Sequence, residues 1–171
     1  MSTLATYLYA FMIAIYPISN HAVTESSDVT EVRYHELAES TAFAVMQPYV
    51  KPLPGTTRAL TGLIQLSTAR FESSYVGEVV DCTKGGDGGR SWGPFQTQRA
   101  KSRTCWSTLG AAGVALEMMH ESFLVTRGRP MEDRLAHYTD GPKWLTEKAA
   151  KRSRARLGLA LRYWRAHPFV E

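Results

Sequence analysis

Helical periodicity stops in one stretch of this chain, between residues 74 and 90, and this interruption limits the folds open to it. Six glycines lie between residues 77 and 93, and glycine permits tight turns and close approach of a ligand to the backbone. Residues 75–80, Tyr-Val-Gly-Glu-Val-Val, have the composition of a short strand. We therefore expect a small, irregular β-hairpin within an otherwise helical chain.

Helical patterns flank this stretch on both sides. Apolar residues recur at three- and four-residue spacing from residue 34 to residue 45, before Pro48. Asp28 could cap the start of this helix, with Glu31 reaching back to it. Further helices are expected at residues 56–72, 109–125, 131–138 and 143–167. Thr139-Asp140-Gly141-Pro142 ends the helix at 131–138, and Pro142 can open the helix that follows it. The helix at 109–125 is expected to be central, because its small residues let another helix approach closely.

The chain of 171 residues is long enough for one compact domain with its own core, which we place at residues 23–171. Residues 4–18 are nearly all apolar, too short for a comfortable membrane span but right for the core of a secretory signal. No basic residue precedes Arg33, and residues 20–22 make a poor cleavage site. We expect residues 1–22 to be an export signal or an uncleaved membrane anchor, with a buried first helix as the alternative.

Charge is divided unevenly along the sequence. Residues 1–83 carry four Lys/Arg and eight Asp/Glu, whereas residues 84–171 carry sixteen and eight, so the two parts have formal charges of −4 and +8. The basic part indicates an anionic partner, such as cell-wall polymer, a membrane surface or nucleic acid, and a solvated basic helix is the alternative. No helix-turn-helix or zinc-finger pattern accompanies residues 148–165, so we do not expect nucleic acid.

Cys82 and Cys105 are the only cysteines, and they bracket the glycine-rich stretch. Two cysteines without Cys-x-x-Cys spacing are too few for a zinc site of their own. We expect one disulfide that pins the loop, which requires an oxidising compartment, and two unrelated buried thiols are the alternative. His120-Glu121 lacks the second His of a zinc-protease helix, and phosphate-loop and nucleophile-elbow motifs are absent from the sequence. We expect no metal and no cofactor.

Glu72 is the leading candidate for a general acid. Leu60, Ile64, Thr68 and Glu72 are spaced four residues apart, which places them in line on one face of the expected helix. A carboxylate held beside apolar groups loses hydration, so its pKa rises and it can remain a proton donor near neutral pH. The alternative is a solvated or capping residue at the helix end.

Three motifs resemble those of a known family. Glu72-Ser73 followed by Gly93-Pro94-Phe95-Gln96 resembles the Glu-Ser and Gly-Leu-Met-Gln signature of the lytic transglycosylase domain, in the lysozyme-like superfamily. Residues 138–142, Tyr-Thr-Asp-Gly-Pro, are similar to that family's Ala-Tyr-Asn-Ala-Gly motif. The resemblance covers residues 55–165. Pro94 and Phe95 replace Leu and Met, and Asp140 interrupts the Asn-Ala pair. The Gly-Pro-x-Gln run is also similar to a segment of family 19 chitinases.

The resemblance implies an α+β, mainly α-helical, lysozyme-like fold with the hairpin beside the catalytic helix. Glu72 would protonate the bridging oxygen of the β-1,4 bond between MurNAc and GlcNAc. A transglycosylase would then form a 1,6-anhydro product. An inverting muramidase would need a second carboxylate, roughly 6.5–9.5 Å away, to hold a water. Asp81 and Asp87 are the main candidates for this second acid, with Glu78 also available, although Asp is also common in turns.

Gln96 and Tyr138 are expected to flank the acid. A Gln side chain offers both a donor and an acceptor to an acetamido group, and a Tyr hydroxyl can bond to the glutamate or the sugar. The further candidates for sugar contacts are Ser91, Trp92, Gly93 and Phe95. For Trp92 and Phe95 the alternative is a buried aromatic that holds the hairpin to the helices.

The sequence therefore predicts an extracytoplasmic, monomeric glycosidase that cleaves peptidoglycan glycan strands, as a lytic transglycosylase or a lysozyme-type muramidase. Membrane attachment through residues 4–18 is part of this expectation. The alternatives are a family 19 chitinase-like hydrolase and a non-catalytic lysozyme-fold protein that binds cell wall or a partner.

Overall fold

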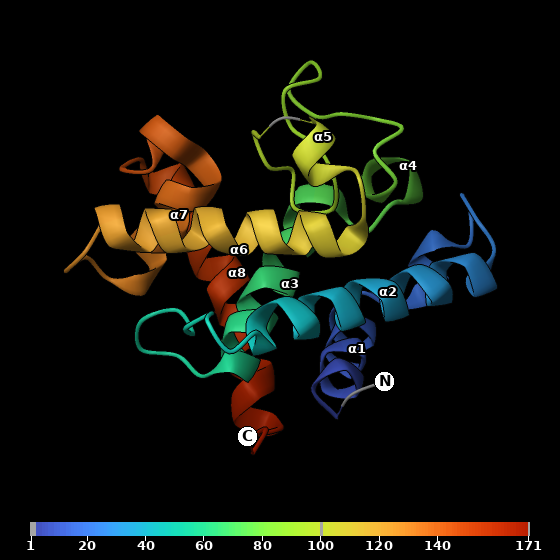
Figure 1. Cartoon of the computed structure of the whole chain (residues 1–171), viewed down its shortest axis with the longest axis horizontal. Helices are drawn as coiled ribbons and strands as arrows, with labels where there is room; N and C mark the ends of the chain where they lie inside the picture. Colours follow the sequence, from blue (N-terminus) through green and yellow to red (C-terminus); the bar gives the residue numbers. More distant parts are fainter. Residues whose placement is uncertain (1–2, 100, 171) are drawn as a thin grey trace.

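A computed structural model describes residues 3–99 and 101–170 of the protein, and every regular element in these two ranges is a helix (Figure 1). The described residues form eight α-helices and two short 3-10 helices. In chain order the elements are α1 (Thr3–Ile15), η1 (Ile18–His21), α2 (Ser27–Met46), α3 (Arg58–Ser73), α4 (Gly77–Val80), α5 (Lys101–Thr104), α6 (Thr108–Val125), α7 (Met131–Asp140), η2 (Gly141–Lys143) and α8 (Glu147–Ala166). The prediction of a mainly α-helical protein is confirmed.

The expected β-hairpin is not formed as a pair of strands. Within the described residues the glycine-rich loop contains only two isolated antiparallel bridges, Gly86 with Ser91 and Trp92 with Thr97. Residues 75–80, expected as a strand, instead form the end of a turn and then the short helix α4. The chain turns sharply at the start of this segment: Ser74 and Tyr75 have φ values of 51° and 56°, a left-handed backbone that an extended strand does not have.

Some predicted helix boundaries are also corrected. Ser26, not Asp28, caps α2, and its hydroxyl accepts from the N–H group three residues on. Thr57 caps α3 in the same way, close to the predicted start. The last helix starts later than expected, at Glu147 with Thr146 as its cap, because Pro142 lies in the separate 3-10 turn η2.

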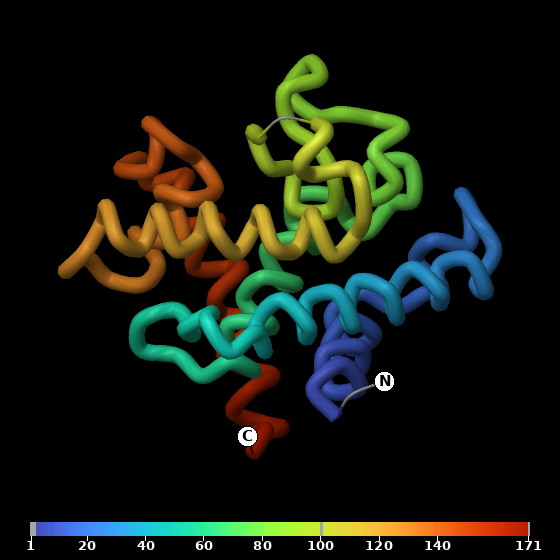
Figure 2. The backbone as a smooth tube through the Cα atoms, viewed as in Figure 1, coloured from blue at the N-terminus to red at the C-terminus, as the bar shows by residue number. Residues whose placement is uncertain are grey.

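The most buried helix is α3, although the sequence favoured α6 as the central one. Every side chain from Ala59 to Ala69 is buried, and α3 packs against α1, α2 and α8. Helix α6 instead crosses the molecule beside α2, α5 and α7 (Figure 2). Glu72 therefore projects from the end of a helix that the rest of the domain surrounds.

The apolar N-terminal segment is a core helix in this structure. Leu8 and Phe11 of α1 are fully buried, and α1 packs on α2 and α3. Gly62 of α3 permits this approach, since a Cβ atom there would lie 3.1 Å from Leu8 Cδ1. The Tyr7 hydroxyl donates to the His167 carbonyl at 2.7 Å, which ties α1 to the C-terminal segment. This packing matches the alternative expectation of a buried first helix. No helix in the described part of the chain is long and apolar enough to cross a membrane.

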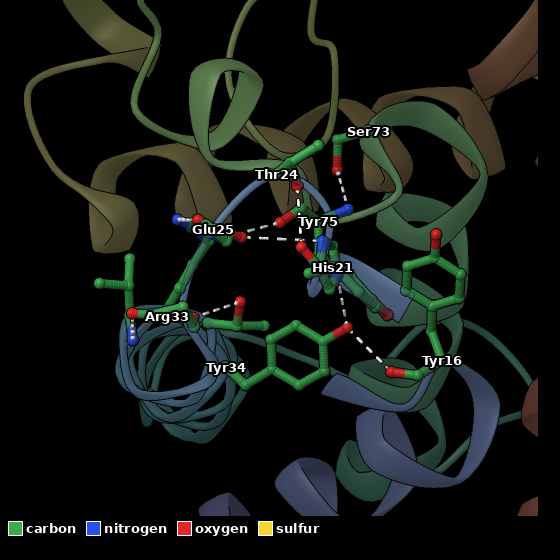
Figure 3. Close-up of polar contacts among 11 residues, drawn as sticks. Tyr16, His21, Thr24, Glu25, Arg33, Tyr34, Ser73 and Tyr75 are labelled. Atoms are coloured by element: carbon green, nitrogen blue, oxygen red, sulfur yellow. Dashed lines mark hydrogen bonds and ion pairs between the residues drawn. The ribbon is translucent and has the colours of Figure 1, made fainter. Parts of the chain in front are cut away.

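A buried polar cluster connects the N-terminal segment to the turn after Glu72 (Figure 3). Arg33 of α2 donates to both carboxylate oxygens of Glu25, and to the Tyr75 carbonyl at 3.3 Å. His21 Nε2 lies 3.1 Å from the Tyr34 hydroxyl. Buried charges require partners, and the Arg33 guanidinium finds them in Glu25 and in the Tyr75 carbonyl of this turn. The cluster therefore fixes the backbone immediately after the end of α3.

A disulfide joins Cys82 and Cys105, as the sequence predicts, with their Cα atoms 5.8 Å apart. It closes the glycine-rich loop between the end of α4 and the end of α5. The cross-link restricts a long, irregular segment that has few regular hydrogen bonds of its own. The disulfide thus limits the conformations that the loop can adopt.

Replacing both Cys82 and Cys105 by serine is expected to lower the free energy of unfolding by about 3 kcal/mol, the order found for loops of this size. Urea denaturation followed by circular dichroism measures the loss. Reducing agent should destabilise the wild type by a similar amount and leave the double variant unchanged. An unchanged urea midpoint in the variant would contradict a stabilising role for the disulfide.

Candidate active-site cleft

A cleft of about 720 Å³ opens beside the end of α3. Its lining comes from the glycine-rich loop, from α6, from α7 and η2, and from Arg152 of α8. In Figure 1 the loop (yellow-green) and α7 (orange) both rise on the same side of α6. Segments that are far apart in the sequence therefore meet around Glu72.

The cleft gathers most of the candidate residues. Those that line it are Glu72, Asp87, Ser91, Phe95, Gln96 and Tyr138. Phe95 is only 2% exposed, so it contributes to the wall as a buried aromatic. The lining does not include Asp81, Trp92 or Gly93. Trp92 instead packs within its own loop, where Lys101 Nζ lies 4.2 Å from the ring centroid.

Glu72 sits where the helix pattern predicted, at the end of a buried face. Leu60, Ile64 and Thr68 on this face are at most 5% exposed, whereas the Glu72 side chain is 23% exposed. Burial raises the pKa of Glu72 above the ordinary glutamate value. The side chain is therefore both accessible from the cleft and partly desolvated, as a proton donor must be.

Two arginines of α8 hold the two carboxylates of this region. Arg156, which is 4% exposed, donates to Glu72 Oε1. One turn earlier Arg152 Nη1 lies 2.9 Å from Asp140 Oδ1. Burial is the largest influence on the pKa of Glu72, Arg156 and Arg152 lower that pKa, Asp140 raises it, and the net shift is upward. The sequence interpretation did not include these ion pairs.

Polar atoms of two side chains near Glu72 have no hydrogen-bond partner among the described residues. The Tyr138 hydroxyl is buried and has no hydrogen-bond partner among the described residues. The Nε and Nη1 atoms of Arg156 also lack an acceptor within this part of the chain. Burial, and next the charge of Glu72, raise the pKa of Tyr138, so its hydroxyl keeps its proton. A buried polar group left unpaired costs about 1–3 kcal/mol, so the surroundings of Glu72 suit a polar ligand.

Glycine at one loop position makes room for Gln96. A Cβ atom at Gly86 would lie 2.0 Å from Gln96 Oε1, so any other residue there would displace this side chain. Gln96 has a φ of 47°, and its Nε2 donates to the Gly93 carbonyl at 2.9 Å. The amide oxygen thus lies close to Gly86, and both residues line the cleft. Asp87 Oδ2 accepts from the Ser91 hydroxyl at 2.8 Å.

Further ionisable residues that were not among the candidate site residues also line the cleft. They are Arg90, Glu121, His137, Asp140, Lys143 and Arg152. His137 Nδ1 lies 3.1 Å from the Ser122 hydroxyl, which places its ring against α6. Among the described residues, no three His, Cys, Asp or Glu side chains gather closely enough to hold a metal ion. The polar groups that line the cleft are carboxylates, arginines, amides and hydroxyls, together with His137 and Lys143.

Comparison with protein-family models, with curated proteins and with solved structures finds no match to this chain. The resemblance to lytic transglycosylases thus rests on the three sequence motifs, and the site is interpreted from its geometry.

Proposed function

We propose that the protein is a lysozyme-like glycosidase that cleaves the β-1,4 bond between MurNAc and GlcNAc in peptidoglycan. The observation that carries this proposal is the convergence of Glu72, Gln96 and Tyr138 on one cleft. These residues come from three segments, and each belongs to one of the three motifs. Random placement of three motifs would not bring their polar side chains to a common cavity.

In this proposal Glu72 acts first as an acid and then as a base. Burial keeps its proton at a higher pH than an exposed glutamate would allow. The proton passes to the bridging oxygen as the bond from MurNAc C1 to that oxygen breaks, so that GlcNAc leaves with its hydroxyl and positive charge develops at C1 of MurNAc. Arg156 then stabilises the Glu72 carboxylate. That carboxylate takes a proton from the substrate's own C6 hydroxyl, which gives a 1,6-anhydro sugar, or from water, which gives a reducing end.

The surrounding groups suit an amino-sugar polymer. Gln96 can offer its amide oxygen to the N–H of an acetamido group, and the buried Tyr138 hydroxyl has no hydrogen-bond partner among the described residues. The disulfide between Cys82 and Cys105 supports an oxidising, extracytoplasmic location, where the cell wall lies. Peptidoglycan glycan strands are therefore the partner that we propose.

The test is loss of turbidity of purified cell walls. Glu72→Gln is expected to reduce the lysis rate by about 10²–10⁴, the range for removal of a general acid. Glu78→Gln is the matched control, because this carboxylate is 68% exposed and lies outside the cleft. Circular dichroism verifies that both variants fold. Equal lysis by the wild type and Glu72→Gln would refute the assignment.

Mass spectrometry of the released fragments distinguishes the two reaction types. Anhydro ends would identify a transglycosylase, and reducing ends would identify a muramidase. Chitin oligomers serve as a parallel substrate. Cleavage of chitin without release from cell walls would favour the family 19 chitinase-like alternative.

A non-catalytic wall-binding protein is the second candidate, and one observation favours it. Helix α8 exposes a series of basic side chains: Lys148, Lys151, Arg152, Arg154, Arg162 and Arg165. Such a surface attracts anionic polymers without any chemistry. If wild type and Glu72→Gln both fail to lyse walls but both sediment with them, binding is the function.

A further inference from the structure

Arg152 and Arg156 occupy successive turns of the same face of α8, four residues apart, where side chains are neighbours. They reach two carboxylates that come from different helices. Arg156 pairs with Glu72 at the end of α3, and Arg152 pairs with Asp140 at the end of α7, at 2.9 Å. The four side chains thus form two ion pairs whose arginines are neighbours on α8.

Asp140 is held firmly in this arrangement. Its side chain is 9% exposed, and Oδ1 faces Arg152 while Oδ2 accepts from the Thr139 hydroxyl at 2.9 Å. Both carboxylate oxygens are therefore occupied. Arg152 is 45% exposed, so Asp140 is the group that fixes an otherwise mobile cationic side chain.

We propose that Asp140 is a positioning residue for the acid: by holding Arg152 it leaves Glu72 with a single close cationic partner, Arg156. This inference rests on the proposed function, because it concerns how Glu72 is kept able to donate a proton. Two close arginines would favour the ionised carboxylate, which is the form unable to act as an acid. Asp140 is also the residue that departs from the related family motif.

The charges that face Glu72 have opposing effects. Burial raises its pKa most, Arg156 and Arg152 of α8 lower it, and Asp140 of α7 raises it. Tyr138, also on α7, keeps its proton and contributes no charge. The other titratable groups that line the cleft are Asp87, Arg90, Glu121, His137 and Lys143. Removing the Asp140 charge therefore takes away one group that raises the pKa of Glu72. It also releases Arg152, which lowers that pKa.

The experiment titrates Glu72 directly in the full chain, using ¹³C-labelled glutamate and NMR of the side-chain carboxyl, assigned with Glu72→Gln. Asp140→Asn is expected to lower the Glu72 midpoint by about one pH unit, a tenfold change in the ratio of protonated to ionised Glu72 at fixed pH. Arg152→Gln is expected to raise the midpoint by a similar amount. Asp133→Asn, the same substitution elsewhere on α7, should leave it unchanged, because Asp133 pairs with Arg129 and lies outside the cleft.

Because Arg152 is well exposed, Arg152→Gln is expected to fold even if Asp140→Asn does not. In that case the change in the Glu72 midpoint of Arg152→Gln alone tests the proposal. An unchanged midpoint in Arg152→Gln would overturn the proposal. In wall lysis, the alkaline limb of the pH–rate profile should move in the same directions as the midpoints. Opposite midpoint shifts without lysis by the wild type at any pH would support the electrostatic pairing and refute the proposed glycosidase.

Discussion

Phe11→Ala is expected to lower the free energy of unfolding by about 3–5 kcal/mol, the cost typical of deleting a buried aromatic side chain. Phe11 lies in α1, within the segment whose composition resembles an export signal, yet it is fully buried. Its ring meets Tyr163 of α8 edge to face, with centroids 5.1 Å apart. Since domains are stable by only about 5–15 kcal/mol, this single change removes a large fraction of the total.

Urea denaturation of the full chain measures this loss. Val23→Ala is the control, because Val23 is 97% exposed and should change stability by no more than about 0.5 kcal/mol. If both variants unfold at the wild-type urea concentration, the N-terminal segment is not part of the folded domain. N-terminal sequencing of protein recovered outside the cytoplasm then tests cleavage directly: a start beyond Ile18 indicates a removed signal.

The contrast between α1 and α3 illustrates which helices a sequence reveals. Helix α3 carries a capping Thr57 and an apolar line that ends in Glu72, so its position and buried face were both predictable. Residues 4–18 are apolar on nearly all sides, and composition alone does not separate a signal from a helix that is enclosed by the core. In the structure α1 packs on α2 and α3, as a core helix does.

Parts of the loop and of the site could likewise be predicted from the sequence, and other parts depend on tertiary packing. Val76, Val79 and Val80 gave residues 75–80 the composition of a strand, whereas the left-handed backbone at Ser74 and Tyr75 depends on tertiary contacts. Glu72, Gln96 and Tyr138 could be found because they belong to motifs. Arg156 could not be found in this way, since it is one of many basic residues in α8 and lies 84 positions from Glu72 in the chain. The packing of α8 against α3 places Arg156, among these basic residues, beside Glu72.

Arg156→Met is expected to lower the free energy of unfolding near pH 8 by about 3 kcal/mol. This is at the lower end of the range for breaking a buried ion pair, because Glu72 remains 23% exposed. The double variant Glu72→Gln/Arg156→Met should lose less than the sum of the single variants, since neither charge is then left alone. Urea denaturation of all four proteins forms a double-mutant cycle, and a coupling energy of about 1–3 kcal/mol is expected. Strictly additive losses would mean that the pair does not stabilise the fold.

The stability deficit of Arg156→Met should also depend on pH, and the sign follows from Glu72. Burial already raises the pKa of Glu72 in the folded protein, and loss of Arg156 raises it further. Between the unfolded value and this raised pKa, the folded state binds more protons, so stability falls as pH rises through this window. Near pH 4 Glu72 is largely protonated in the folded variant, and the deficit should almost vanish. A deficit of equal size at about pH 4 and pH 8 would show that Arg156 stabilises the protein by packing rather than by its charge.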